Sequence, residues 1–290
     1  MNVRFLKWVI MRLANLPYGV TLRLGSIVGF LAYHLASRRR RIALVNINKC
    51  FPELDEKAQK NLVMAQFKAT GTGLIEAPIG WFGDERKLMS LSKISGREHL
   101  DAALAQGRGA IVLTFHYACM DMAGLQLSHE YPLAFMHRPH NDPELNELFT
   151  KGRLRFAKRA ISRHNPRDML KALKENLVVC YYPDHDLGRK SSEFAPFFGI
   201  PTAWVSAISR MAQISGAPVV PMLCDRLPNG KGVHIRLQPA LDNFPTDSVL
   251  DDLTRVSLLL ESHLREQPAN YLWSHRRFKT RPEGEPSFYQ

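Results

Sequence analysis

The sequence predicts an α/β protein in which a mixed, largely parallel central sheet is flanked by helices and follows a helical N-terminal segment. Short apolar, β-rich runs alternate with helical patterns from about residue 97 to residue 266, as is typical of such sheets. The length of 290 residues suits one large α/β domain or two small ones, and the continuous alternation of strands and helices favours one. A hydrophobic content of 45% and a charged content of 23% are ordinary for a globular chain and exclude global disorder.

The strands are predicted from apolar runs that are bounded by glycine, proline or polar residues. We expect strands at 109–115, 132–137, 177–182 and 217–224. Residues 233–238 alternate between apolar and polar types, so we place this strand near an edge or on a half-exposed face.

The helices are predicted from apolar residues at helical spacing and from their end signals. Gly107 takes the usual place after the last turn of the helix 97–106, and Pro166 takes the first position of the helix 166–176. The remaining expected helices are 55–74, 143–160, 202–215 and 248–266.

Residues 1–36 are apolar and rich in aromatic side chains, and a run of four arginines, 38–41, follows them. Arginines and a proline interrupt the apolar stretch, which falls short of the roughly twenty residues that a transmembrane helix needs. This pattern favours a segment that lies in or dips into an anionic leaflet, with the arginines on the cytoplasmic side. We therefore divide the chain into a membrane-associated helical segment, 1–45, and a domain, 46–290. A pair of ordinary core helices remains the alternative.

The chain is strongly basic, with a net charge of +12, and should attract polyanions such as anionic lipid, phosphorylated substrates, an acidic carrier protein or nucleic acid. Single-stranded nucleic acid is disfavoured, because the aromatic residues are not interleaved with the basic ones. The four cysteines form no CxxC pair, which excludes a zinc ribbon or a thioredoxin motif. Cys119 is a candidate nucleophile, although a reduced structural cysteine is the simpler interpretation.

His116 follows directly on the expected strand 109–115, and Asp121 comes five residues later in the stretch TFHYACMD. Sites in open α/β sheets collect at the carboxyl ends of strands. On one regular helix this spacing corresponds to about 140° of rotation, but across a strand-to-helix turn the two side chains can meet. We expect the aspartate to hold one imidazole nitrogen while the other acts as a base. A buried histidine beside a surface acid is the alternative.

A second candidate segment, YYPDHDLGRKSSEFAPFFG at 181–199, also begins at a strand end. Its many hydrogen-bond donors could cradle an anion. The D-H-D run within it could instead bind a metal ion, but neighbouring basic residues can neutralise its carboxylates and no further ligand pattern stands out. The basic residues of 151–168 indicate only a solvated helix face. The basic, aromatic tail 273–286 indicates only contact with a polyanion or a membrane.

Taken together, several blocks of the sequence resemble the lipid A late acyltransferases, the lauroyl and myristoyl transferases of Gram-negative lipopolysaccharide synthesis. This family lies within the glycerolipid and lysophospholipid acyltransferase group, whose members share a motif of histidine, four residues and an acid. The resemblance covers nearly the whole chain. Its blocks are CFPE (50–53), HYACMD (116–121), RPHNDPELN (138–146), GRLR (152–155), PDHDLG through FAPFFG (183–199), GAPVVP (216–221) and WSHRRFKTRPEG (273–284).

The resemblance implies a glycerolipid acyltransferase-like fold and a set of site residues. His116 and Asp121 match the family's catalytic pair, and the tail residues Arg276, Arg277 and Lys279 match a block that could face the membrane or acceptor phosphates. We expect the substrate-binding residues to be Arg153, Asp184, Arg189, Ser191 and Ser192. No metal site and no cofactor are implied.

The implied reaction moves a fatty acyl chain from acyl carrier protein to a hydroxyl of a hydroxyacyl chain on a lipid A precursor. The expected partners are acyl carrier protein, that precursor and inner-membrane lipids, with no nucleic acid, and the expected location is the cytoplasmic face of the bacterial inner membrane. The alternatives are an acyltransferase of the same group that uses a lysophospholipid, glycolipid or aminolipid, a non-catalytic membrane-surface or nucleic-acid-binding protein, and a metallohydrolase.

Overall fold

A seven-stranded sheet forms the centre of the protein in the computed structural model, which describes residues 3–137, 139–162 and 165–289. Its order is β1-β9-β8-β2-β5-β3-β4. The strands are β1 Ser92–Ser95, β2 Ala110–Leu113, β3 Leu133–His137, β4 Arg159–Ser162, β5 Val178–Tyr181, β8 Val219–Arg226 and β9 Val233–Leu237. Every pair is parallel except β8 with β9. The predicted mixed, largely parallel sheet is therefore confirmed.

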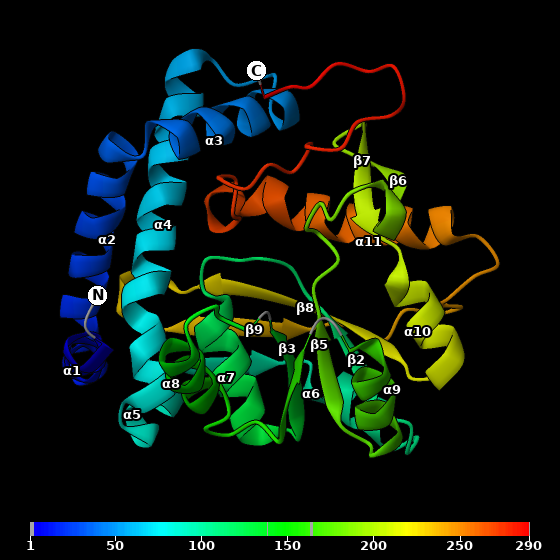
Figure 1. Ribbon diagram of the computed structural model, residues 1–290, viewed down its shortest axis with the longest axis horizontal. Helices are drawn as coiled ribbons and strands as arrows, with labels where there is room; N and C mark the ends of the chain where they lie inside the picture. Colours follow the sequence, from blue (N-terminus) through cyan, green and yellow to red (C-terminus); the bar gives the residue numbers. More distant parts are fainter. Residues whose placement is uncertain (1–2, 138, 163–164, 290) are drawn as a thin grey trace.

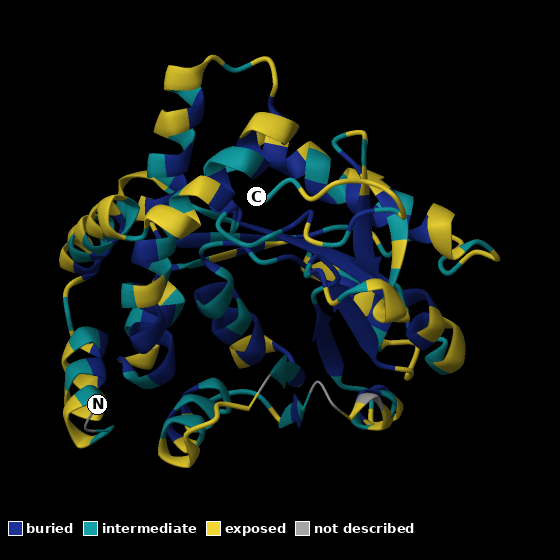
Figure 2. Ribbon diagram, turned by 45° about the horizontal axis from the view of Figure 1, so that its top comes forward, coloured by how far each residue is buried: buried dark blue, intermediate teal, exposed yellow. Residues whose placement is uncertain are grey.

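The sheet is central because its middle strands are apolar on both faces. All four residues of β2 and of β5 are buried, as the unbroken apolar runs predict. In β9, buried and half-buried residues alternate, and only β1 lies between it and the edge, so the prediction for residues 233–238 is confirmed. The core is built around this sheet, whose central strands are dark blue in Figure 2, and it includes the buried faces of the helices packed on it.

Eleven α-helices surround the sheet within the described residues, and side-chain caps fix the start of several of them. Asp55 accepts a hydrogen bond from the backbone N–H of Ala58 at 2.7 Å, and Ser248 accepts one from Asp251 at 3.2 Å. The helices are α1 Val3–Ala14, α2 Tyr18–Leu35, α3 Ser37–Cys50, α4 Glu56–Phe82, α5 Glu85–Ser90, α6 Arg97–Leu104, α7 Met120–Glu130, α8 Pro143–Arg153, α9 Pro166–Lys174, α10 Ala207–Ser215 and α11 Val249–Glu266.

Helices α2 and α4 stand side by side along one end of the molecule (Figure 1). Their backbones approach closely at glycines: a Cβ added to Gly29 would lie 2.2 Å from the carbonyl oxygen of Phe67, and one added to Gly71 would lie 2.4 Å from the backbone of Gly25. The C-terminal segment returns to the same end, where Lys49 of α3 lies 4.6 Å from the ring centroid of Phe288.

The N-terminal helices expose large apolar side chains, and exposed residues line their outer side in Figure 2. Among the described residues, no single helix has both the length and the apolarity that a membrane crossing requires. Helices α2 and α3 taken together meet that requirement by length and composition alone, and they meet at an angle of 93°. The exposed apolar residues of the N-terminal helices include Phe5 and Trp8 of α1 and Ile27, Leu31 and Leu35 of α2.

The structure corrects two predicted helices. The helix expected at 143–160 ends at Arg153, and the edge strand β4 follows, because Arg159–Ser162 pairs with β3. The helix expected at 202–215 begins only at Ala207. The residues before it form β7 Ile200–Val205, which pairs antiparallel with β6 Ser192–Phe197 in a separate hairpin that packs on α11. The 3₁₀ turns are η1 Arg189–Ser191, η2 Pro228–Gly230 and η3 Pro268–Asn270.

The other differences are smaller. Helix α4 continues past the predicted end at residue 74 to Phe82, although Pro78 lies inside it. A proline removes one backbone hydrogen bond, and the buried residues around Pro78 hold the last turns in place. Strands β1 and β4 were not predicted, because four-residue edge strands with mixed composition give no apolar run. Arg138, the first residue of the RPHNDPELN block, lies outside the described residues.

Candidate active site

The site forms at one edge of the sheet because the parallel strands β2, β3 and β5 end there together. His116 follows β2, Asp184 follows β5 and His137 is the last residue of β3. Residues far apart in sequence are thus brought to one place by strand register.

His116 is held by Asp184. The ring Nδ1 lies 2.8 Å from Asp184 Oδ1, and the backbone N–H of His116 donates to Asp184 Oδ2 at 3.1 Å. The Asp184 side chain is fully buried, whereas the His116 side chain is 16% exposed. An ionised carboxylate can only accept, so Nδ1 carries the proton and the lone pair is left on Nε2. This is the tautomer that a general base requires.

Asp184 stays ionised in this setting. Burial alone would raise its pKa, but the charge of His116 and the hydrogen bonds from the ring and backbone of His116 bring the pKa below the ordinary value of an aspartate. The carboxylate therefore remains available to stabilise an imidazolium at His116.

Asp121 does not occupy the position that the sequence led us to expect. Its Oδ1 lies 3.6 Å from Nε of Arg153, and among the described residues the carboxylate that bonds the His116 ring is Asp184. The physical reason is local: Asp121 is in the first turn of α7, and three residues separate this helix from His116. Asp184, expected to bind substrate, lies instead buried behind the ring.

His116, Asp121 and Arg153 nevertheless line one cavity of about 320 Å³. One wall is a single face of α7, which presents residues at helical spacing from Met120 to Ser128. The opposite wall comes from β3, the end of α8 and the end of β5, and it is mainly apolar. The full lining is His116, Met120, Asp121, Gly124, Leu125, Ser128, Leu133, Phe135, Met136, His137, Arg153, Ala157, Cys180 and Tyr182.

The segment that carries His116 is hydrogen-bonded to residues 270–272, at the end of η3 and just after it. The N–H of Ala118 donates to the carbonyl of Asn270 at 2.7 Å, and the N–H of Leu272 donates to the carbonyl of His116 at 3.2 Å. An isolated bridge joins Tyr117 to Tyr271. The position of the His116 imidazole thus depends on a segment more than 150 residues away in sequence.

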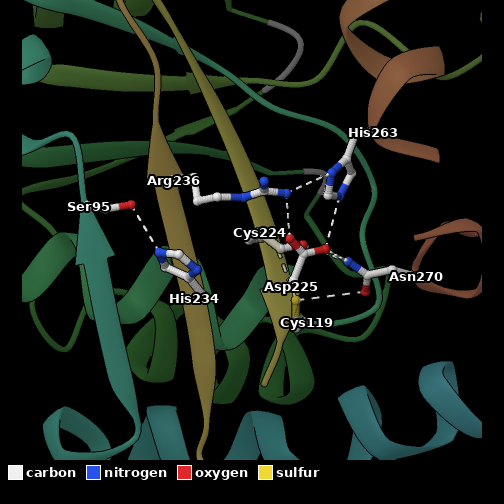
Figure 3. Close-up of polar contacts among 8 residues, drawn as sticks. All are labelled: Ser95, Cys119, Cys224, Asp225, His234, Arg236, His263 and Asn270. Atoms are coloured by element: carbon white, nitrogen blue, oxygen red, sulfur yellow. Dashed lines mark hydrogen bonds and ion pairs between the residues drawn. The ribbon is translucent and has the colours of Figure 1, made fainter. Parts of the chain in front are cut away.

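A second polar cluster includes Asn270 and so adjoins these hydrogen bonds (Figure 3). Asp225 accepts from Arg236 Nη2 at 2.7 Å and lies 3.1 Å from His263 Nε2. Asn270 donates through Nδ2 to the carbonyl of Cys224. The cluster ties β8, β9, α11 and η3 together, and so it holds the segment that anchors His116.

Cys119 belongs to this cluster and not to the cavity. The residue is 1% exposed, and its Sγ lies 3.7 Å from Cys224 Sγ and 3.8 Å from Asn270 Oδ1. The structural interpretation of this cysteine is therefore supported over the nucleophile.

Besides Asp184, three of the expected substrate-binding residues lie outside the cavity lining. Arg189 and Ser191 are in η1, and Ser192 begins β6. Arg189 lines a separate hollow of about 570 Å³ formed with the C-terminal tail, and its Nη2 donates to the carbonyl of Arg281 at 2.7 Å. A role for these three residues in substrate binding remains a prediction.

Arg277 corrects the expectation that it faces the membrane or acceptor phosphates. It is 1% exposed, its guanidinium carbon lies 4.1 Å from the ring centroid of Trp204, and Nη1 donates to the carbonyl of Ala203 at 2.6 Å. The D-H-D run is equally internal, since Asp184 and Asp186 are both buried. Within residues 3–137, 139–162 and 165–289, no group of three or more His, Cys, Asp or Glu side chains could hold a metal ion.

Two further histidines continue from His116 in a stack: His185, which belongs to the D-H-D run, and His275. The ring of His185 stacks on that of His116, and His275 stacks on His185. The only sequence signal was their presence in the PDHD and WSHRR blocks, which are 90 residues apart.

Comparison with known proteins identifies the family. The family model for bacterial lipid A biosynthesis acyltransferases matches residues 3–280. The chain is 36% identical to the lipid A biosynthesis lauroyltransferase of Escherichia coli over 97% of this chain and 92% of that protein. It is 32% identical to the palmitoleoyltransferase of the same organism over 95% of this chain and 90% of that protein.

Among solved structures, a 1-acyl-sn-glycerophosphate acyltransferase from Thermotoga maritima aligns with 88% of this chain and 99% of its own, at 13% identity and a TM-score of 0.41, which is too loose a likeness to support an argument. The family model and the two E. coli relatives agree with the blocks quoted from the sequence. This chain belongs to the bacterial lipid A biosynthesis acyltransferases.

Proposed function

We propose that this protein transfers a fatty acyl chain from the thioester of acyl carrier protein to the hydroxyl of a hydroxyacyl chain on a lipid A precursor. The observation that carries the proposal is the imidazole of His116, oriented by a buried carboxylate and placed on a largely apolar cavity. Membership of the lipid A acyltransferase family supports the choice of acceptor.

The chemistry begins at Nε2 of His116. This nitrogen takes the proton of the acceptor hydroxyl as the hydroxyl oxygen attacks the thioester carbonyl. The tetrahedral intermediate then expels the thiolate of the carrier, which receives the proton from the imidazolium. Asp184 keeps Nδ1 protonated and stabilises the imidazolium between the two steps.

Asp121 and Arg153 act as a second pair in this scheme. The guanidinium of Arg153 lines the same cavity as His116 and lies against Asp121, which keeps it close to the cavity without fixing its direction. A cation at this position suits the negative oxygen of the tetrahedral intermediate. The role we assign to Asp121 is therefore to position Arg153, while the role of holding the imidazole passes to Asp184.

The acyl chain occupies the apolar part of the cavity in this proposal. Leu125, Leu133, Phe135 and Ala157 line it together with Cys180, whose thiol stays protonated because burial raises its pKa to about 12. Such a lining excludes water from a reactive thioester, which protects the acyl group from hydrolysis.

We also propose that the protein works at the cytoplasmic face of the bacterial inner membrane. Trp8 and Phe5 of α1 are 54% and 60% exposed, and Leu35 of α2 is 81% exposed. Apolar and aromatic side chains beside the arginine run 38–41 suit an anionic lipid surface. The net charge of +12 suits an acidic carrier protein and a phosphorylated acceptor as well.

The decisive experiment replaces His116 by alanine and measures transfer of a labelled acyl chain from acyl carrier protein to a lipid A precursor. We expect a loss of roughly a hundredfold or more, with an unchanged circular dichroism spectrum. His99→Ala, a change at a half-buried histidine of α6, serves as the matched control and should retain full activity. Wild-type-like transfer by the His116 variant would reject the mechanism.

The acceptor is tested separately. Mass spectrometry of lipid A from a strain with and without the gene should show the loss of one secondary acyl chain. An unchanged lipid A pattern, together with acyl transfer to a lysophospholipid, glycolipid or aminolipid in vitro, would assign the enzyme to the alternative acceptor.

A further inference from the structure

Three imidazole rings form a continuous stack that begins at the proposed general base. The ring centroids of His116 and His185 are 3.5 Å apart with an angle of 9° between the planes. Those of His185 and His275 are 4.2 Å apart with an angle of 8°. The rings come from the end of β2, the segment after β5 and the C-terminal tail.

Hydrogen bonding does not account for the two outer rings. Nε2 of His185 and Nδ1 of His275 are buried, and neither has a hydrogen-bond partner among the described residues. A buried polar atom without a partner costs free energy, so a phenylalanine would pack there at lower cost. The presence of two histidines at this place calls for a reason other than packing.

The surroundings keep both outer rings neutral. Burial, followed by the charge of His116, lowers the pKa of His185 to about 3 and that of His275 to about 4. Asp184 opposes this shift at both rings and Asp186 opposes it at His275, while Arg277 adds to it.

A neutral aromatic face lies favourably against a cation. When His116 takes the proton of the hydroxyl it becomes an imidazolium, with Asp184 in its plane and the face of His185 parallel to it. The same contact fixes the tilt of the ring, because rotation of His116 about its side-chain bonds would lose the stack.

We propose that His185, supported by His275, is a positioning residue for His116: its ring face sets the plane of the imidazole and stabilises the imidazolium formed during acyl transfer. The proton remains on His116 until it passes to the thiolate, and His185 neither gains nor loses one. The catalytic part of this inference rests on the proposed function, whereas the effect on the His116 ring itself does not.

The test compares His185→Leu, which fills the space without a π face, with His185→Phe, which restores a flat ring that cannot titrate. His99→Ala is the control. We expect His185→Leu to lower kcat by about 3- to 30-fold with KM for both substrates nearly unchanged, and to move the acidic limb of the pH–rate profile to lower pH. His185→Phe should recover most of the lost kcat.

A second readout does not use activity. Titration of ¹⁵N-labelled histidine in the full chain by NMR should show that His116 loses its proton at lower pH in His185→Leu than in the wild type, and at a nearly wild-type pH in His185→Phe. Equal titration of His116 in all three proteins, or a Phe variant as slow as the folded Leu variant, would overturn the inference. A wild-type protein that transfers no acyl chain but shows the expected titration would defeat the proposed function alone.

Discussion

Gly124 offers a direct way to test which cavity holds the acyl chain. It lies inside α7 and lines the cavity that contains His116. A Cβ added to Gly124 meets no atom within 4 Å, so a larger side chain can enter the cavity without displacing the backbone. The substitution Gly124→Leu therefore removes space for a substrate while it leaves the imidazole and its partners in place.

The expected magnitude follows from the four carbons that leucine adds. They displace about four methylenes of a chain that fills the cavity, and each buried methylene contributes about 0.8 kcal/mol, which gives about 3 kcal/mol in total. This corresponds to a loss of roughly two powers of ten in kcat/KM for the longest chain that the wild type accepts. Donors about four carbons shorter should be used almost as well as before. Because glycine disfavours a helix interior by about 1 kcal/mol, the variant should unfold at an equal or higher temperature.

The assay is competition among acyl carrier protein thioesters of graded chain length, with products identified by mass spectrometry. Gly19→Leu is the matched control, because Gly19 is also helical, also has open space at its Cβ and lies on the exposed side of α2. A second series varies the hydroxyacyl chain of the acceptor and distinguishes the donor chain from the acceptor chain. A uniform loss at all lengths of both substrates, or an unchanged profile, would refute the placement of the chain in this cavity.

Three further outcomes are expected. Asp184→Asn should lower kcat by roughly 10²- to 10⁴-fold, because its amide can donate to Nδ1 and so favours the tautomer without a lone pair on Nε2; steady-state kinetics measure this. Trp8→Glu should weaken co-sedimentation with vesicles rich in anionic lipid. Because the pKa values of His185 and His275, about 3 and about 4, lie below their ordinary 6.5, the unfolded chain binds more protons between pH 6 and pH 4. The free energy of unfolding, measured in urea, should therefore decrease as the pH is lowered from 6 to 4. The decrease should be up to about 1.4 kcal/mol per pH unit for each histidine.

The central strands could be predicted because a strand buried on both faces must be apolar throughout. The runs at 109–115 and 177–182 became β2 and β5, and the step from the first run to His116 placed this histidine at the sheet edge. The short strands escaped prediction since β4 carries one buried residue in four, so its pairing with β3 decides its structure more than its composition does.

The family pattern named two residues that line one cavity, but it did not predict their contacts. His116 and Asp121 are five apart in sequence, and that closeness suggested a direct bond. The bond is made to Asp184 instead, 68 residues away, because the register of β2 with β5 aligns the ends of the two strands. Sequence separation carries no information on such a pairing, and the same holds for the stacking of His185 on His116.

The two carboxylates at the site differ in depth, and depth explains why their roles divide as proposed. The side chain of Asp184 is fully buried beside His116, where little water screens its charge, so it can stabilise an imidazolium strongly. The side chain of Asp121 is 32% exposed and lies 3.6 Å from Arg153, a distance at which solvent weakens the pair. A weakly held guanidinium can turn toward an oxyanion when one forms, whereas a base must be held before the reaction starts. Exchanging the two partners, with a buried acid on the arginine and an exposed acid on the histidine, would leave a rigid cation and a poorly oriented base, which is the less reactive arrangement.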